Sequence, residues 1–191
     1  MILPIVAYGD PVLKRKAQEI DEDYPELQQL IDDMFETMEN AQGVGLAAPQ
    51  IGRSIRLFVI DASSFYDENE PETEELKNFQ HVFINPIIEE EEGEEWKFSE
   101  GCLSIPTIRE DVFRKPKLKI SYYDRDFNFH EKALDGYAAR IVQHEYDHVE
   151  GVLFTDRINP LRKGLLKSRL VNISKGNVQV SYRMRFPARK R

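Results

Sequence analysis

The sequence predicts an α+β fold, a single domain in which antiparallel sheets pack around one central helix, with a helix and a strand at the C-terminus. Three observations support this prediction. The expected elements follow the order helix, several strands, helix, helix, strand. A chain of 191 residues, of which 41% are hydrophobic, suits one core rather than two. Residues 1–191 also contain no internal repeat and no clear domain boundary.

The first helix is expected at residues 25–41, where apolar residues recur at steps of three and four and form one stripe. Asp23, followed three residues later by Glu26, resembles a capping box at its start. Gly43 and Gly45 end the helical pattern. The stripe predicts that one face of this helix packs into the core.

Two more helices and a strand are expected in the second half of the chain. A helix over residues 136–150 has Gly151 in place to cap its C-terminus with a left-handed backbone. The next helix, residues 160–174, begins after Asn159, a favourable N-cap, with a proline in the first turn. Apolar residues then alternate with polar ones over residues 178–186, which predicts a strand.

Other strands are expected in the middle of the chain, where short runs are rich in β-branched and aromatic residues. The expected strands are residues 56–60, 81–88, 118–123 and 128–132. Two acidic stretches interrupt this region. Residues 67–75 are expected to form an exposed loop insertion, and residues 89–95 to prolong a hairpin at the surface.

Composition limits the cellular setting. No apolar run approaches the roughly 18 to 20 residues that span a bilayer, so no membrane association is expected. The first residues lack the basic start and the long apolar run of a signal peptide. Cys102 is the only cysteine, which excludes an internal disulfide and favours a cytoplasmic location.

Charge is distributed unevenly along the chain, which has a net charge of −8. Residues 160–191 contain ten Lys or Arg and no Asp or Glu. The other 159 residues hold the remaining 16 basic and all 34 acidic residues, a net charge of −18. A basic end on an acidic body indicates either contact with a polyanion such as RNA or a solvated tail.

Residues 144–148 read His-Glu-Tyr-Asp-His, an H-E-x-x-H motif within the second predicted helix. Positions i and i+4 of a helix lie on the same face, so His144 and His148 can bind one metal ion. Glu145 can then exchange a proton with water activated by that metal. The alternative is a chance match in a charged surface helix. This face borders the buried face, however, where polar groups without partners are costly.

A catalytic metal site of this kind needs a third protein ligand. Downstream of the motif there is no further histidine, and the only acidic residues are Glu150 and Asp156. Upstream, the options are His81, His130 and Cys102. Cys102 follows a glycine, which lets the backbone approach closely, and its thiolate is a strong ligand for a divalent transition metal.

Residues 43–50 read Gly-Val-Gly-Leu-Ala-Ala-Pro-Gln, which matches no phosphate-binding or dinucleotide-binding pattern. Small residues let a backbone lie against a ligand. Gln50 ends the run with a side-chain amide that can donate to an oxyanion. Taken alone, the segment is more typical of a tight glycine-rich turn.

Together, residues 43–50, 100–104 and 143–148 resemble three motifs of the peptide deformylase family, in the same order and at similar spacing. The family motifs are G-x-G-Φ-A-A-x-Q, E-G-C-Φ-S and H-E-x-x-H, where Φ is an apolar residue. Residues 8–13 also resemble the start of family members, and the resemblance extends from about residue 4 to residue 158. It implies hydrolysis of the N-formyl group from the initiator methionine of new polypeptides.

The resemblance implies a role for each matching residue. The implied metal ligands are Cys102, His144 and His148, and the implied catalytic groups are Glu145 as general acid and base, with Gln50 and the backbone N–H of Leu103 as the oxyanion hole. One divalent metal ion is implied, iron(II) in the cell, and zinc, nickel or cobalt are compatible with the same ligands. An exposed iron–thiolate site is expected to be sensitive to oxygen.

N-formylmethionyl peptides are expected to bind as an added strand at a sheet edge. The resemblance implies that Gly45 belongs to the backbone wall beside the peptide and that Arg109 lies near its exit. Val44, Tyr137 and Ile141 are candidates for an apolar pocket that takes the methionine side chain.

The sequence departs from the family at two places. Arg140, in the turn before His144, stands where the family is often apolar, which bears on the lining of the methionine pocket. Many relatives end in a basic helix, whereas here the predicted strand and the basic residues 189–191 follow that helix. We expect the basic region 160–191 to contact ribosomal RNA, or the strand to close a sheet edge instead.

Two other functions fit parts of the sequence. A general zinc metallopeptidase would explain the H-E-x-x-H motif, but not the upstream segments that contain Cys102 and Gln50. The second is a non-catalytic metal-binding or ribosome-associated protein with a dead site. It would be expected to lack one of the catalytic groups, and all of them are present.

Overall fold

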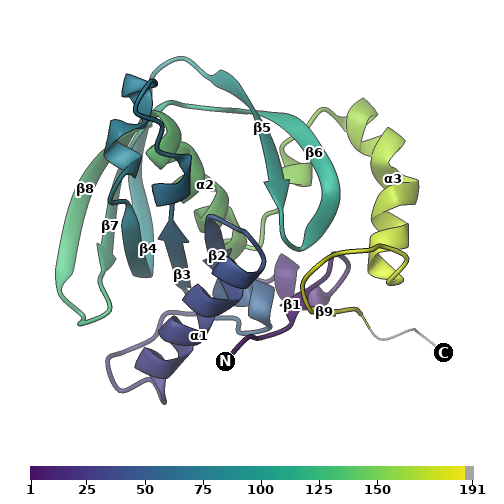
Figure 1. Cartoon of the computed structure of the whole chain (residues 1–191), viewed down its shortest axis with the longest axis horizontal. Helices are drawn as coiled ribbons and strands as arrows, with labels where there is room; N and C mark the ends of the chain where they lie inside the picture. The colour runs from purple at the N-terminus through teal and green to yellow at the C-terminus, as the bar shows by residue number, and fades with distance from the viewer. Residues whose placement is uncertain (188–191) are drawn as a thin grey trace.

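Residues 1–187 are described by a computed structural model, and they form a five-stranded sheet, two two-stranded sheets and three α-helices (Figure 1). The predicted α+β fold is confirmed, including the antiparallel sheets around the H-E-x-x-H helix and the helix and strand at the C-terminus. The basic residues 189–191 lie outside the described residues.

The largest sheet has the strand order β2-β3-β4-β7-β8, and all of its neighbouring strands are antiparallel. Its strands are β2 (Gly45–Ala47), β3 (Leu57–Asp61), β4 (Gln80–Glu92), β7 (Lys117–Tyr123) and β8 (Phe129–Asp135). The four strands expected in this part of the chain correspond to β3, β4, β7 and β8. Strand β2, within the glycine-rich segment, was not expected.

Helices cover both faces of this sheet. In β3, Leu57 and Val59 pack in one cluster with α1 (Leu27–Asn40), whereas Phe58 and Ile60 pack in another with α2 (Gly136–Val149). All four side chains are fully buried. Because successive residues of a strand point to opposite faces, this burial fixes the sheet between the two helices.

The second sheet is a hairpin of β5 (Trp96–Cys102) and β6 (Ile105–Arg114), which was not expected from the sequence. Its apolar side packs with α3 (Pro160–Ser174) in a third cluster. The members from β6 and α3 are Ile105, Ile108, Val112, Leu166, Leu170 and Ile173. In the third sheet, β1 (Ile5–Val6) pairs in parallel with β9 (Met184–Arg185), so segments near the two ends of the chain lie together (Figure 1).

The capping box expected at the first helix is wrong. The helix begins at Leu27, and Glu26 before it has a left-handed backbone (φ 55°) with no side-chain cap. The chain turns at Tyr24, whose carbonyl accepts from Leu27 N–H, so Asp23 lies too early to reach the helix end. The caps of the other two helices are confirmed: Gly151 has φ 75°, and Asn159 accepts from Leu161 N–H.

The strand expected at residues 178–186 is shorter than predicted, because β9 contains only Met184 and Arg185. The alternation itself is present: even-numbered residues from 178 to 186 are half-buried, and the odd-numbered ones are exposed. The alternating pattern therefore reflects an extended segment with one packed side. It forms a short ladder because its partner β1 is only two residues long.

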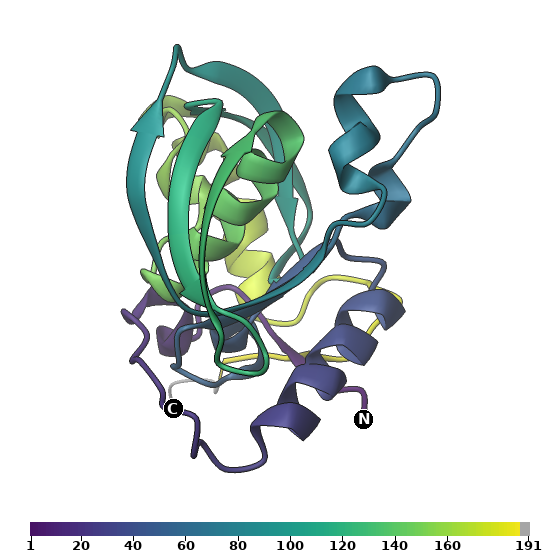
Figure 2. The same ribbon diagram turned by 90° about the vertical axis from the view of Figure 1, so that its left-hand side faces the viewer.

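One of the two acidic stretches agrees with its prediction and the other does not. Residues 67–75 form an exposed segment that projects from the body of the molecule (Figure 2) and includes most of a 3₁₀ helix, Pro71–Leu76. Residues 89–92 end β4 and pair with β7, which is not the next strand along the chain, so the expected hairpin is wrong. Across residues 1–187, no helix has the length and apolar character needed to cross a membrane.

Candidate active site

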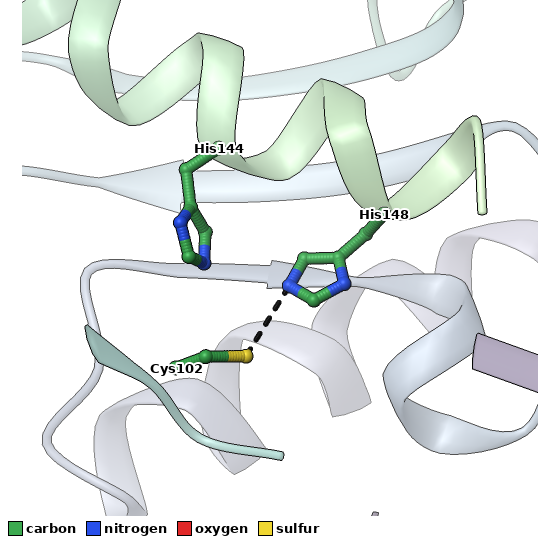
Figure 3. Close-up of side chains that lie close together, drawn as sticks. All are labelled: Cys102, His144 and His148. Carbon is green, nitrogen blue, oxygen red and sulfur yellow. Dashed lines mark hydrogen bonds between the residues drawn. The ribbon is translucent and has the colours of Figure 1, made fainter. Parts of the chain in front are cut away.

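The three predicted metal ligands converge at one point (Figure 3). His144 and His148 extend from α2 toward Cys102 at the end of β5. The Cys102 Sγ atom lies 3.3 Å from His148 Nε2, and one ligand atom of each residue lies within 4.8 Å of the others. The alternative ligands His81 and His130 lie on β4 and β8, outside this cluster.

The residues present fit a divalent transition metal, for which a cysteine sulfur and imidazole nitrogens are suitable donors. His144 Nδ1 is 2.9 Å from Glu100 Oε2, which leaves Nε2 available to a metal. Among the described residues, the buried Oε2 atom of Glu145 has no hydrogen-bond partner. This orphaned oxygen belongs to a residue that lines the same cleft as Cys102 and His144, and it fits a site that takes a polar molecule beside the metal.

Glu145 is buried and lies against the backbone of β2. A Cβ atom at Gly45 would be only 2.6 Å from Glu145 Cδ, so the position of the carboxylate requires a glycine there. A Cβ atom at Gly43 would be 2.8 Å from Leu103 Cδ1. Burial raises the pKa of the Glu145 carboxyl to about 7, against the opposing effect of His144. The glycines of residues 43–50 thus let this segment approach the site closely.

Gln50 lies in the 3₁₀ helix Ala48–Ile51, and only 1% of it is exposed. Its Oε1 atom accepts from Ala47 N–H at 2.9 Å, which fixes the amide so that Nε2 faces the cluster. Nε2 lies 3.4 Å from Cys102 Sγ and 3.3 Å from Ser104 Oγ. Leu103 lies between these two residues, so the two predicted oxyanion donors are neighbours.

A buried ionic network contacts the predicted metal ligand His144 through Glu100. The Glu100 carboxylate accepts from Arg114 Nε at 2.7 Å and Nη2 at 3.0 Å, as well as from His144. Asp147 accepts from Arg114 Nη1 at 2.8 Å and from Arg157. Burial alone would raise the pKa of Glu100, but Arg114 and His144 hold it well below its ordinary value.

The sequence patterns did not assign roles to this network. Glu100 and Asp147 stand inside the E-G-C and H-E-x-x-H motifs, and that position is the signal that could have identified them.

Arg140 belongs to the same network and is 2% exposed. Its Nη1 donates to Glu100 Oε1 at 3.0 Å and to the Val112 carbonyl at 3.1 Å, and Nη2 donates to the Trp96 carbonyl at 2.7 Å. The guanidinium carbon lies 4.6 Å from the Trp96 ring centroid. Arg140 thus lies at the cleft, as the sequence suggested, while its guanidinium is turned toward Glu100.

A cleft of about 570 Å³ opens beside the cluster. Four of the five predicted substrate-binding residues line it, namely Val44, Gly45, Arg109 and Ile141. Tyr137 is not in the lining; its ring packs edge-on against Trp96 and Phe98. The lining also includes residues that were not predicted from the sequence: Phe65, Phe98, Val180, Ser181 and Tyr182.

Known proteins resemble this chain over most of its length. A model of the family described as "Polypeptide deformylase" matches residues 2–164. A peptide deformylase of Christiangramia forsetii is 58% identical over 194 aligned positions that cover 100% of this chain and 99% of the relative. One from Salinibacter ruber is 46% identical, with 95% and 93% covered.

A solved structure is similar over nearly its whole length. The crystal structure of a peptide deformylase from Thermus thermophilus matches with a TM-score of 0.79 and 40% identity, and the match covers 92% of this chain and 99% of that one. The chain therefore belongs to the polypeptide deformylase family, the metal-dependent hydrolases that remove the N-formyl group from new polypeptides.

Proposed function

We propose that residues 1–191 form one catalytic domain that removes the N-formyl group of the initiator methionine and releases formate at the site around Cys102. The observation that carries this proposal is the convergence of Cys102, His144 and His148 with Gln50 and Glu145 from separate segments of the chain. Because new polypeptides are its substrates, the proposed place of action is the cytoplasm.

In this proposal Cys102, His144 and His148 hold one divalent metal ion, Fe²⁺ in the cell, with Zn²⁺, Ni²⁺ or Co²⁺ as alternatives. When bound, such an ion supplies a Lewis acid and makes water a nucleophile near neutral pH. Cys102 is half-buried rather than sealed from solvent, which supports the expectation that oxygen inactivates the iron form.

The other groups move a proton and stabilise charge. Glu145 accepts the proton of the attacking water and returns it to the amine nitrogen that leaves. The Nε2 amide of Gln50 and the backbone N–H of Leu103 donate to the oxygen of the formyl group as negative charge develops on it. Gly45 contributes by leaving room for the Glu145 carboxylate.

The substrate backbone is proposed to lie along β2, one of the two edge strands of the five-stranded sheet. Recognition by strand addition reads the backbone, which suits an enzyme that acts on many different polypeptides. Val44, Ile141 and Phe98 line the cleft and supply apolar surface for the methionine side chain. Arg109 lies in the lining as well, and we propose that it contacts the peptide beyond the methionine.

The test is formate release from a formyl-Met peptide by protein prepared without oxygen, with metal content measured on the same sample. The same peptide without the formyl group should not be cleaved, which distinguishes this activity from that of a metallopeptidase. Exposure of the iron form to air should remove activity, and reloading with another divalent metal should restore it. Absence of formate release from metal-loaded protein would refute the proposal.

A contact with ribosomal RNA through the basic region 160–191 is proposed as a second function. Lys167, Leu161 and Leu165 are exposed on α3, and the exposed Lys175 follows its C-terminal end. The double variant Lys167→Glu, Lys175→Glu should weaken co-sedimentation with ribosomes, with a steep dependence on salt.

A matched control tests whether α3 is the specific site of this contact. Lys117→Glu with Lys119→Glu reverses two exposed charges on β7 and should leave ribosome binding unchanged. Equal weakening by both pairs would count against a specific contact through α3. Formate release from free peptides should remain normal in both double variants.

A further inference from the structure

Leu103 and Ser104 form the two-residue turn of the β5–β6 hairpin, between the paired residues Cys102 and Ile105. Two-residue hairpin turns favour backbone types with positive φ, because these match the twist of the strands. Neither Leu103 nor Ser104 has a positive φ, and the strand register shifts between Gly101 and Cys102. The turn that carries an oxyanion donor therefore needs support from outside the hairpin.

Three hydrogen bonds supply that support, and each comes from a distant segment. Gln50 Nε2 donates to Ser104 Oγ at 3.3 Å. The backbone N–H of Tyr8 donates to the Ser104 carbonyl at 2.9 Å. The hydroxyl of Tyr182 donates to the Leu103 carbonyl at 2.7 Å. Two of the three supports thus belong to segments near the two ends of the chain.

These two segments are held in place by their own pairing (Figure 1). Tyr8 lies two residues after β1, and Tyr182 lies two residues before β9. The parallel pair is closed by hydrogen bonds from Ile5 N–H to the Arg183 carbonyl and from Ala7 N–H to the Arg185 carbonyl, both of 2.9 Å. The Tyr182 ring is half-buried and packs against the core around α1, so its hydroxyl has little freedom to leave the turn.

We propose that Tyr182 is a positioning residue for deformylation. Its hydroxyl fixes the Leu103 carbonyl and, through this residue, the direction of the Leu103 N–H beside Cys102. Val180 and Ser181, from the same segment, line the cleft with it. This inference rests on the proposed function, because it needs the oxyanion role of Leu103. It gives the C-terminal segment a part in catalysis that is separate from any contact with the ribosome.

The variant Tyr182→Phe removes the hydroxyl and keeps the ring. We expect kcat for a short formyl-Met peptide to fall roughly three- to tenfold, the effect of one hydrogen bond. KM and metal content should stay the same, because an oxyanion donor acts on the transition state. The backbone amide signal of Leu103 in the NMR spectrum should also shift. Tyr123→Phe is the matched control, since Tyr123 is a half-buried tyrosine on β7 outside the cleft.

The outcomes separate this inference from the proposed function. Wild-type protein that releases no formate would refute the proposed function itself. An active wild type with an equally active Tyr182→Phe variant would overturn the role of Tyr182 alone. A variant that changed only KM, lost metal or melted at a much lower temperature would also overturn it, because the hydroxyl would then be structural.

Discussion

Two halves of the active site are supported in different ways. The helix half consists of His144, Glu145 and His148, which lie within one continuous α-helix above the buried Glu100 network. The turn half consists of Gln50, Cys102 and Leu103, which come from a 3₁₀ helix, a strand end and a hairpin turn. The helix half is fixed mainly by local geometry, and the turn half by contacts between distant segments.

This difference predicts how each half responds to substitution. Residues in the helix half are held by the helix itself, so a change of one side chain removes its chemistry and leaves its neighbours in place. The turn half depends on pairs 52 and 79 residues apart in the chain, Gln50 with Cys102 and Leu103 with Tyr182. Loss of one such contact is expected to lower the rate while the fold stays intact.

The largest effect is expected from Glu145→Gln in the helix half. The amide has the size of the carboxylate but cannot carry the proton, so formate release should fall roughly 10²- to 10⁴-fold. Metal content should be unchanged, because the three ligands remain. Tyr146→Phe, on the next residue of the helix, is a control that should stay fully active. A Glu145→Gln enzyme with bound metal and normal turnover would contradict the proposed proton transfer.

The next effect is expected in the turn half. Gln50→Ala removes one oxyanion donor and should lower kcat by about 10²- to 10³-fold, with metal still bound. Gln50→Glu is a second variant that separates the donor role of the amide from its role as an acceptor. It keeps an oxygen that accepts from Ala47 N–H but lacks the amide donor. Steady-state kinetics should show that both variants are impaired. Recovery of activity in Gln50→Glu would indicate that Gln50 only anchors its own loop.

Glu100→Gln is expected to have a smaller effect on rate and a larger one on stability. It removes the charge that compensates the buried Arg114 and Arg140, and breaking such a network typically costs about 3–5 kcal/mol of unfolding free energy. Loss of the partner of His144 should weaken metal binding about 10- to 100-fold.

Urea unfolding and metal titration measure the two effects of Glu100→Gln. Asp111→Asn, which breaks the exposed pair with Lys97, is the control and should change neither quantity much. If Glu100→Gln unfolded at the same urea concentration as wild type, the network would not be needed for stability.

The contrast between the halves also explains what the sequence could predict. Apolar residues that recur with the helical period of 3.6 predict the helix half. The helix expected at residues 136–150 therefore differs from α2 by only one residue, at its C-terminal end. Strands β3, β4, β7 and β8 are also predicted by local signals, namely the alternation of apolar and polar residues and the presence of β-branched residues. Resemblance to the three family motifs, and no local pattern, predicts that Cys102 and Gln50 share a site with this helix.

Other features lie beyond local patterns. Gly101, Pro106 and the charged residues 109–111 obscure the sequence pattern of the β5–β6 hairpin, and within residues 1–187 its sheet has only these two strands. Glu100 and Arg114 look like surface residues in the sequence, but they are buried in an ionic network that also includes Arg140, His144 and Asp147. Tyr182 could not be assigned to the site, because its partner Leu103 is 79 residues away and accepts through a backbone carbonyl.

The smallest effect on activity is expected from Asp156→Asn. This variant tests whether the fold next to the helix half can be destabilised without a loss of formate release. Asp156 lies in the 3₁₀ helix Phe154–Asp156 after α2 and joins three segments. It forms ion pairs with Lys14 and with Lys163, the latter at 2.7 Å, and accepts from Leu153 N–H at 2.9 Å. Burial opposes its ionisation, but these partners lower the pKa of Asp156 to about 2.

The low pKa sets the pH range in which Asp156 stabilises the fold. Its carboxyl has a pKa near 3.8 without these partners, so its stabilisation is complete above about pH 4 and is lost as the pH falls through about 2.

At pH 7, Asp156→Asn should lower the unfolding free energy by about 1–2 kcal/mol in urea titrations. This difference from wild type should shrink as the pH falls from 4 toward 2. Formate release at pH 7 should be unchanged, because Asp156 touches neither half of the site. A stability difference that stayed constant over that pH range would mean that Asp156 acts through hydrogen bonding and packing, and that the helix half does not depend on its charge.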